Sequence, residues 1–432
     1  MYSLTLYAVL FVGILRFSES SFSLIAEWVA LDFAWDDSDS STSESYWTSQ
    51  GYPQSCALAG IKVGYSGVMY VTVPRWVSGV PSTLNTVRFE SDGTATLVPF
   101  PSWDFNTNTL RNCQSMIIDA QNRMWIIDVG RENFYDPTPD TLVNAPAKVL
   151  ILDLDTNDLL WTYQFPNIVV PYDNSFLNDI ALDLDGGFAY FTSTWGDGLI
   201  VVYDFINNSS WSFTGPSTER DSSWDFIVDD FNYGTDGVGA SPADGIAVTP
   251  DGSYLYYCSV QGVKLWKIST DTLKNSGASN DDFNEATMLI GNKTGPSDGI
   301  MIQGSTLFYG DIQYSALKQA SVEDGVPFES ITPGENENDF RWIDTFSDAL
   351  DGSGTLYFVA NHLDEFFNGT MNFESTSPNF RIYRYTADSE GDSDDYTLVL
   401  TAILCGFAGI VLSIAFYVYV FCRPIHNVNE NM

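Results

Sequence analysis

The sequence NDIALDLDGGFAYF at residues 178–191 decides the fold. It contains a short apolar stretch, a turn made of Asp and Gly, and a second stretch rich in aromatic residues, which is typical of a β-hairpin. The same order returns as DGIAVTPDGSYLYY at 244–257 and as DGIMIQGSTLFY at 298–309. Because one hairpin pattern recurs along the chain, the sequence predicts a repeat architecture.

Three further copies bring the number of repeats to six. Each copy has a central apolar residue in its first strand, and these residues lie 55, 64, 66, 54 and 46 positions apart at Ile61, Met116, Ile180, Ile246, Ile300 and Phe346. No long segment has the 3.6-residue period of an amphipathic helix, so the fold is expected to be all-β. Repeats of this length predict a six-bladed β-propeller over 21–386. A solenoid of hairpins is the alternative, but it would need capping repeats and more regular spacing.

Strand-like segments also stand at both ends of this region. Residues 25–33 precede the first complete copy, and residues 380–385 follow the last one. In a closed propeller such a pair can complete one blade from both chain ends, which removes the exposed strand edge. We therefore expect the two segments to lie in the same blade.

The two ends of the chain predict targeting segments. Residues 1–20 contain an apolar run followed by small polar residues and are interpreted as a signal peptide, although the positive n-region is missing and a buried strand is the alternative. Residues 396–421 form an uncharged apolar stretch, long enough to be one transmembrane helix. The acidic juxtamembrane linker 387–395 and Arg423 in the tail 422–432 fit the positive-inside rule. The sequence therefore predicts a single-pass type I protein anchored in the lipid bilayer, with an extracellular or luminal propeller and a cytoplasmic tail.

Glycosylation signals agree with a secretory route. The predicted propeller contains four N-x-S/T sequons, at Asn207, Asn208, Asn292 and Asn368. A short motif of this kind also arises by chance, so each sequon is weak evidence alone. Together they favour an extracellular or luminal body.

The charge of the chain limits its partners. There are 56 Asp and Glu residues against 18 Lys and Arg residues, which gives a formal net charge of −38. Phosphate binding needs clustered cations, so nucleic acid is excluded as a partner. The chain has only two histidines, His362 and His426, so neither a three-His zinc site nor a Ser-His-Asp triad is expected.

The repeat also locates a candidate site. The first strand of a propeller blade lines the central channel, so the residues two before the central apolar positions should form a ring around its mouth: Ala59, Gln114, Asn178, Asp244, Asp298 and Asp344. Such an acidic, oxygen-lined ring suits a cationic ligand or a hard metal such as calcium, with Asn178, Asp244 and Asp298 as metal-ligand candidates. A hydrolytic metal site would also need a Glu that these strands do not supply. The alternative is that the Asp and Asn side chains only cap turns.

Longer motifs resemble those of the yellow and major royal jelly protein family. They include YVTVPRW at 70–76, GVPSTLN at 79–85, RMWIIDVG at 123–130 and GLIVVYD at 198–204, and the similarity extends over about 28–385. The resemblance implies a six-bladed propeller, in agreement with the repeat count. Family members include dopachrome-converting enzymes, salivary proteins that bind biogenic amines in the channel, and storage proteins, so fold alone does not decide function.

The resemblance also implies individual site residues. In the amine-binding members, a Thr and an Asn hold the ligand, and they correspond here to Thr345 and Asn361, with Leu363 at an apolar position nearby. His362 stands where the family usually has Arg or Lys. If the protein is an enzyme, His362 is the candidate general base, with a carboxylate of the ring as the alternative.

The cysteines depart from the family pattern. Cys56, Cys113 and Cys258 lie in the predicted propeller, an odd number for an oxidising compartment. Cys56 and Cys113 each precede the first strand of adjacent repeats, so a Cys56–Cys113 disulfide can form. Cys258 would then remain a free thiol.

Three functions remain open at this point. The protein could bind a small, cationic and aromatic ligand of the biogenic-amine type in its channel, which the acidic ring favours because a carboxylate in a partly dry cleft attracts an ammonium group. It could instead catalyse dopachrome conversion by a tautomerase-type reaction. It could also be a structural or adhesive surface protein that uses calcium. The first two functions require no cofactor.

Overall fold

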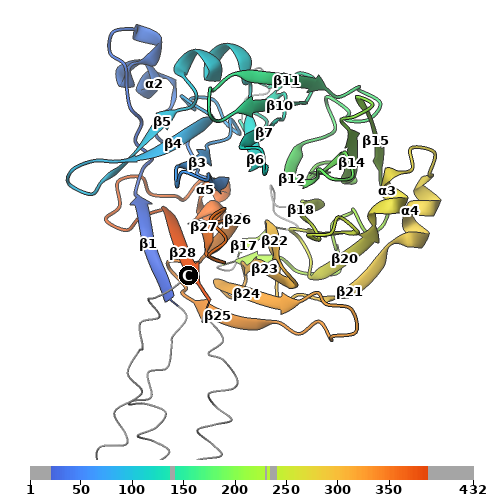
Figure 1. Cartoon of the computed structure of the whole chain (residues 1–432). Coiled ribbons are helices and arrows are strands. Elements are labelled where there is room, and N and C mark those ends of the chain that lie inside the picture. The colour runs from blue at the N-terminus through green and yellow to red at the C-terminus, as the bar shows by residue number, and fades with distance from the viewer. Residues whose placement is uncertain (1–20, 137–141, 229–230, 234–240, 388–432) are drawn as a thin grey trace, which may run out of the picture. The chain divides into compact units, whose positions relative to one another are not determined.

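The computed structural model describes residues 21–136, 142–228, 231–233 and 241–387. In this part of the chain, six four-stranded sheets stand around a common axis with their first strands innermost (Figure 1). The predicted all-β, six-bladed propeller is therefore confirmed. Each sheet corresponds to one copy of the hairpin repeat.

The first five blades are formed by consecutive segments of the chain. The first has β2 (Ile61–Val63), β3 (Met69–Thr72), β4 (Leu84–Phe89) and β5 (Ala95–Pro99), and the second has β6 (Cys113–Ile118), β7 (Arg123–Asp128), β10 (Lys148–Asp153) and β11 (Leu159–Gln164). The third has β12 (Leu177–Asp183), β13 (Phe188–Ser193), β14 (Leu199–Asp204) and β15 (Ser209–Phe213). The fourth has β18 (Ala243–Val248), β19 (Tyr254–Ser259), β20 (Lys264–Ser269) and β21 (Met288–Asn292), and the fifth has β22 (Ile300–Gln303), β23 (Thr306–Asp311), β24 (Ala316–Ser321) and β25 (Ile331–Glu335).

The sixth blade joins the two ends of the propeller. Its strands are β26 (Trp342–Asp348), β27 (Leu356–Asn361), β28 (Phe380–Thr386) and, at the outer edge, β1 (Ser21–Trp28). The predicted closure is confirmed, but β1 ends at Trp28 instead of continuing to residue 33. The reason is that the chain then crosses to the first blade, where Phe33 forms a bridge with Leu97 of β5.

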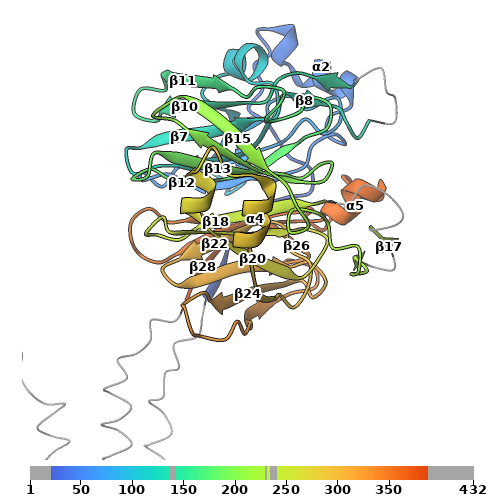
Figure 2. The ribbon, with the colours of Figure 1, turned by 90° about the vertical axis from the view of Figure 1, so that its right-hand side faces the viewer.

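Short elements occupy the connections between the blade strands. They are the 3₁₀-helix η1 (Ser40–Thr42), the π-helical turn η2 (Phe105–Thr109), the helices α2 (Glu44–Gln50), α3 (Thr270–Lys274), α4 (Asn280–Ala286) and α5 (Leu363–Asn368), and the strand pairs β8 (Arg131–Glu132) with β9 (Val143–Asn144) and β16 (Ile227–Val228) with β17 (Phe231–Asn232). Helix α5 and strand β17 project from the same end of the propeller (Figure 2).

The hairpin pattern in the sequence reflects how each blade packs. The central apolar residues of the six inner strands are all buried, with at most 5% of their surface exposed. Several face an aromatic residue across the hairpin, as Ile180 faces Phe191 and Ile246 faces Tyr257. Full burial of such a side chain contributes roughly 1.5–3 kcal/mol to folding. The alternation of apolar and aromatic strands is therefore the sequence signature of the core between the blades.

The ring positions lie where the inner strands leave regular pairing. The register of β6, β12, β18 and β26 shifts immediately before the central apolar residue, so that two residues of each strand are left out of the ladder. Strands β2 and β22 begin only at Ile61 and Ile300, after the equivalent positions. Bulges of this kind re-aim side chains next to functional sites. They leave the ring residues free of the ladder.

The glycines of two Asp-Gly pairs, Asp244-Gly245 and Asp298-Gly299, lie where the inner strands of neighbouring blades approach closely. A Cβ atom on Gly245 would lie 2.5 Å from the carbonyl oxygen of Asp298, and a Cβ atom on Gly299 would lie 2.5 Å from that of Asp344. The Gly299 N–H donates a hydrogen bond to the Asp344 carbonyl at 2.8 Å. Only glycine allows inner strands to come this close. The glycines thus bring three aspartates from adjacent blades together.

The predicted targeting segments lie outside the described residues. This holds for the signal peptide 1–20, the transmembrane helix 396–421, the cytoplasmic tail 422–432, and all of the linker 387–395 except its first residue. Within the part of the chain that the structure describes, no helix is sufficiently long and apolar to span a membrane. The membrane anchor therefore stays a prediction.

Candidate functional site

The inner strands line two cavities along the channel. We call the one at the N-terminal ends of these strands the upper cavity and the one toward their C-terminal ends the lower cavity. The upper cavity leaves a free volume of about 50 Å³ and is lined by Gln114, Asn178, Asp244, Asp298 and Asp344 among others. Five of the six predicted ring residues thus come together in one cavity, whereas Ala59 does not line it.

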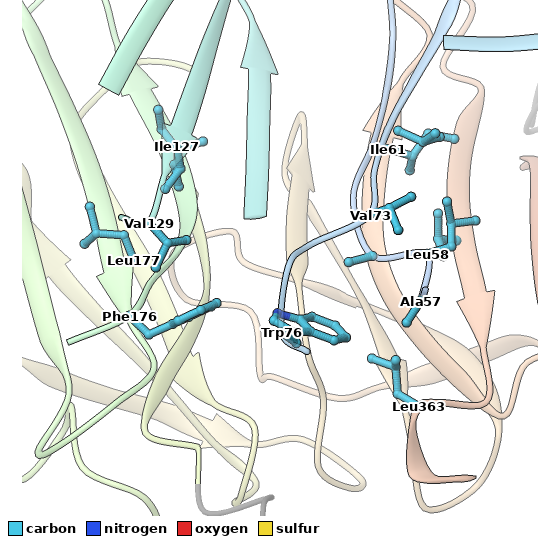
Figure 3. Packing of buried hydrophobic residues seen from close by; sticks show 14 of the residues in the cluster. Ala57, Leu58, Ile61, Val73, Trp76, Ile127, Val129, Phe176, Leu177 and Leu363 are labelled. Atoms are coloured by element: carbon cyan, nitrogen blue, oxygen red, sulfur yellow. The ribbon is translucent and has the colours of Figure 1, made fainter. Parts of the chain in front are cut away.

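Aromatic side chains enclose the upper cavity. This aromatic wall consists of Trp76, Phe134, Tyr135, Phe176, Trp195, Phe226, Trp342 and Phe367. Most of its members come from the loops between strands, and Figure 3 shows Trp76, Phe176 and Leu363, which come from three different blades. Sequence analysis missed the wall. The available signal was an aromatic residue shortly after the second strand of a blade, as with Trp76 after β3 and Trp195 after β13.

The three aspartates form the floor of the upper cavity, here called the carboxyl floor. Each carboxyl group accepts a hydrogen bond from a neighbouring side chain. Asn178 Nδ2 donates to Asp244 Oδ1 at 2.5 Å, and Trp342 Nε1 donates to Asp298 Oδ2 at 2.8 Å. Asn361 Nδ2 donates to Asp344 Oδ2 at 3.2 Å. These bonds fix the orientation of the carboxyl groups before any ligand binds.

Burial and mutual repulsion raise the pKa values of the carboxyl floor. Burial raises the pKa of Asp244 and of Asp344 well above the ordinary 3.8, and the charge of Asp298 raises both further. The pKa of Asp298 is raised less, because hydrogen bonds from Asp244 and Trp342 stabilise its charged form. Like charges this close cannot all ionise. Of this pair, Asp244 therefore favours its protonated form more strongly, and Asp298 takes the negative charge more readily.

Arg131 supports the aromatic wall from behind. Its guanidinium carbon lies 5.6 Å from the ring centroid of Phe134 and 5.0 Å from that of Trp195, both within cation–π range. The same group donates hydrogen bonds to the Ser175 carbonyl and to Asn144 Oδ1. Arg131 is itself buried and does not line the upper cavity. It holds two members of the wall in place without neutralising the carboxyl floor directly.

The residues implied by the family resemblance surround Asp344. Leu363 lines the upper cavity, as expected. Thr345 instead lines the lower cavity, and its hydroxyl donates to Asp344 Oδ1 at 3.0 Å. Asn361 is buried and donates to Asp344 and to the carbonyl of Leu58, while its Oδ1 accepts a hydrogen bond from the Leu363 N–H. Thr345 and Asn361 thus position Asp344 from below and do not line the upper cavity.

His362 does not line either cavity. Its Nε2 atom lies 3.0 Å from the carbonyl oxygen of Asn338, and its Nδ1 atom lies 3.7 Å from Glu365. A general base must reach the proton it removes, directly or through one water. The acid–base groups that meet this condition in the upper cavity are the carboxyl groups of its floor.

The predicted metal ligands do lie together, since Asn178 contacts Asp244 and Asp244 hydrogen-bonds Asp298. However, the contact of Asn178 is made by its amide nitrogen, which is not a metal ligand. Among the described residues, no three His, Cys, Asp or Glu side chains are grouped so that they could hold a metal ion. The sequons at Asn207, Asn208 and Asn292 are exposed, and the one at Asn368 is partly buried.

The Cys56–Cys113 disulfide is not formed. Cys56, Cys113 and Cys258 are all buried free thiols. Cys56 and Cys113 pack in two different hydrophobic clusters, with Cys113 Sγ directed at the carbonyl of Ser115. The disulfide was predicted because Cys56 and Cys113 each precede the first strand of adjacent repeats. These positions do not bring the two sulfur atoms into one environment.

The chain is similar to several known proteins. Protein yellow of Drosophila madeirensis is 26% identical over 383 residues, which cover 82% of this chain and 64% of that protein. Protein yellow of Drosophila pseudoobscura pseudoobscura is 28% identical over 385 residues, which cover 82% of this chain and 65% of that protein, so the chain spans about two thirds of the length of these relatives. A luciferin-regenerating enzyme of known structure superposes with a TM-score of 0.48 at 12% identity, covering 86% of this chain and 96% of that one. The family model described as Major royal jelly protein matches residues 113–392, most of the propeller, and the chain therefore belongs to the yellow and major royal jelly protein family.

Proposed function

We propose that the upper cavity binds a small organic cation with an aromatic ring, such as a biogenic amine. The observation that carries the proposal is the carboxyl floor of Asp244, Asp298 and Asp344 enclosed by eight aromatic side chains. Aromatic faces attract cations and also stack with flat rings. A ligand that combines an ammonium group with an aromatic ring matches both parts of the cavity.

Electrostatics support a cation over a neutral or anionic ligand. The upper cavity is lined by three carboxyl groups and by no Lys, Arg or His from the described residues. An ammonium group near Asp298 would relieve the repulsion that raises the pKa values of the floor. An anion would meet additional repulsion. The charge of the cavity lining therefore favours cationic ligands over anionic ones, whatever their shape.

A second candidate function is acid–base catalysis of the dopachrome-converting type. The observation that favours it is the interacting pair of Asp244 and Asp298, two buried carboxyl groups whose pKa values are raised to different extents. A tautomerisation needs one group to remove a proton and another to return it. In this candidate the pair takes the role that sequence analysis gave to His362.

The location of the propeller belongs to the same proposal. The apolar segment 396–421 would anchor the chain in a bilayer, and the exposed sequons would be modified on the extracellular or luminal side. The cavity would then sample small molecules outside the cytosol. Protease protection of the propeller in sealed vesicles, with and without detergent, tests this orientation.

The binding proposal is tested by titration calorimetry on the full chain in detergent. Dopamine and serotonin serve as cationic aromatic probes, and catechol serves as a neutral probe of similar shape. We expect heat from both amines and none from catechol at the same concentration. Equal behaviour of amines and catechol would contradict the role of the carboxyl floor. A dopachrome absorbance assay on the same samples tests the catalytic candidate, and decay at the rate of the protein-free control would exclude it.

A further inference from the structure

The lower cavity has a different chemistry from the upper one. It leaves a free volume of about 220 Å³, and its walls are mainly aliphatic, with Ile117, Ile180, Ile246, Ile300, Met301 and Phe346 among them. The charged groups that line it are Lys62, Asp179 and Asp348. Neither the family resemblance nor the proposed function uses any of these three groups.

Lys62 breaks the pattern of the inner strands. It directly follows the central apolar residue Ile61, and the five equivalent residues of the other blades are uncharged: Ile117, Ala181, Ala247, Met301 and Ser347. All six of these residues line the lower cavity. Placing a lysine among apolar side chains costs free energy unless its ammonium group interacts with a partner or a ligand. The position therefore indicates a ligand-directed role.

The amino group of Lys62 has spare hydrogen-bonding capacity. It donates to the carbonyl oxygen of Phe346 in the neighbouring blade at 2.5 Å. Across the described ranges it makes no other hydrogen bond and forms no ion pair, although an ammonium group has three N–H donors. The remaining donors of this half-buried side chain are available to the cavity.

Two carboxyl groups flank Lys62 without pairing with it directly. Asp179 accepts hydrogen bonds from the Ser115 hydroxyl and from the Ile180 N–H, both at 2.9 Å. Asp348 accepts one from Gln303 Nε2 at 2.5 Å. Burial raises the pKa of both aspartates and lowers the pKa of Lys62. All three groups therefore favour their uncharged forms more than they would in water.

The charges in the lower cavity select the ligand class. A carboxylate ligand would meet two aspartates, and a cationic ligand would meet Lys62, so an uncharged molecule fits best. The aliphatic walls favour an apolar body, and the free N–H groups of Lys62 need an acceptor. An apolar aldehyde or ketone meets all of these conditions.

We propose that the lower cavity is a second site, in which Lys62 binds an apolar aldehyde or ketone and forms a reversible imine with it. The neutral amine attacks the carbonyl carbon, the carbonyl oxygen takes up a proton and the nitrogen gives up its first proton, which yields a neutral carbinolamine. The C–O bond then breaks, the oxygen leaves as water with a second proton, and the nitrogen loses one proton as the C=N bond forms. Asp179 and Asp348 donate and accept these protons. One carbonyl compound and one amine give one imine and one water, and no oxidant or reductant is consumed.

The proposal does not depend on the function of the upper cavity. Between the two cavities, neighbouring inner strands approach so closely that only Gly245 and Gly299 fit at the contact. A failure to bind amines would therefore leave the proposal for Lys62 standing, and the reverse also holds.

Reductive trapping tests the proposal. The full chain in detergent is treated with octanal and sodium cyanoborohydride, which turns the imine into a stable alkylamine, and each lysine is quantified by peptide mass spectrometry. We expect Lys62 to be alkylated at least about tenfold faster than the partly exposed Lys264, because the cavity concentrates the aldehyde beside the amine. A large excess of octanol, which has the same chain but cannot form an imine, should suppress the reaction at Lys62 only.

Two variants control the experiment. Lys62→Arg keeps the charge and the hydrogen bond to Phe346 but cannot form an imine, so trapping in the lower cavity should vanish while the melting temperature stays near that of the wild type. Lys264→Arg, at the partly buried ion pair with Asp221, should leave the labelling of Lys62 unchanged. Labelling of Lys62 at the rate of Lys264, or labelling that octanol does not suppress, would overturn the proposal.

Discussion

The substitution Asp298→Asn tests how the upper cavity recognises a cation. It removes the charge of the carboxyl floor but keeps the size of the side chain. The asparagine oxygen can still accept the hydrogen bond from Trp342 Nε1, which is 2.8 Å long in the wild type. The aromatic wall should therefore keep its shape, and any loss of affinity reports the lost charge.

The size of the effect follows from the surroundings of Asp298. Two opposite charges about 4 Å apart attract by about 4 kcal/mol at the effective dielectric constant of about 20 that suits partly buried sites. Part of this is recovered, because removal of the Asp298 charge lowers the pKa of Asp244, which can then ionise in its place. We expect a net loss of about 2 kcal/mol, which is about a 30-fold increase in Kd. Replacement of both aspartates by asparagine should cost about twice that free energy.

Calorimetric titration of dopamine into the two variants measures the effect. The control is Asp185→Asn, which makes the same change in net charge at an exposed turn. Because the carboxyl groups of the wild-type floor repel one another, Asp298→Asn should not lower the melting temperature of the ligand-free protein. Equal Kd values for wild type, Asp185→Asn and Asp298→Asn would refute the reasoning.

Four further predictions follow from the same geometry. The pKa values of the carboxyl floor in the folded protein lie above the ordinary 3.8. As pH rises from about 4 through these values, the melting temperature of the ligand-free protein should therefore fall, while its affinity for a cation should rise. A melting temperature and an affinity that both rise, or both fall, with pH would contradict this. Trp76→Ala should weaken amine binding by about 1–2 kcal/mol in the same calorimetric assay, whereas Trp76→Phe, which keeps a ring, should lose clearly less, and equal losses would speak against ring stacking. Ile246→Ala should lower the free energy of unfolding in urea by about 2–5 kcal/mol, whereas Ile206→Ala, at an exposed position, should lower it by about 0.5 kcal/mol or less. Gly245→Ala should lower it by about 1–3 kcal/mol, whereas Gly277→Ala should not, because its Cβ atom would meet nothing closer than 3.4 Å. Similar values within either pair would show that the inner strands are less tightly packed than described.

The repeat made most of the fold predictable. Each blade begins with a local hairpin, and local patterns such as the one at 178–191 are readable because turn residues and strand residues have different physical requirements. Alignment of the copies also placed Asp244, Asp298 and Asp344 at equivalent positions, which is why the carboxyl floor could be found. The end of β1 could not be found in this way, because Phe33 is held by a bridge to a distant blade.

The rest of the site depends on contacts that the repeat does not encode. The aromatic wall comes mainly from loops, whose lengths differ between blades, so most of its members have no common position; the exceptions are Trp76 and Trp195, which follow the second strands of their blades. Thr345 lies only one residue after Asp344, yet the two line different cavities because the bulge in β26 turns them apart. The side chain of His362 is held by Asn338, a residue from another segment of the chain. The positions of these side chains depend on tertiary contacts, which spacing along the sequence does not predict.

The most direct test of the central claim is a crystal structure of the protein with dopamine at saturating concentration. The account predicts ligand density in the upper cavity, with the ammonium nitrogen within hydrogen-bonding distance of the Asp298 carboxylate and the catechol ring against the aromatic wall. Density for the amine elsewhere on the propeller, with none beside Asp298, would contradict it.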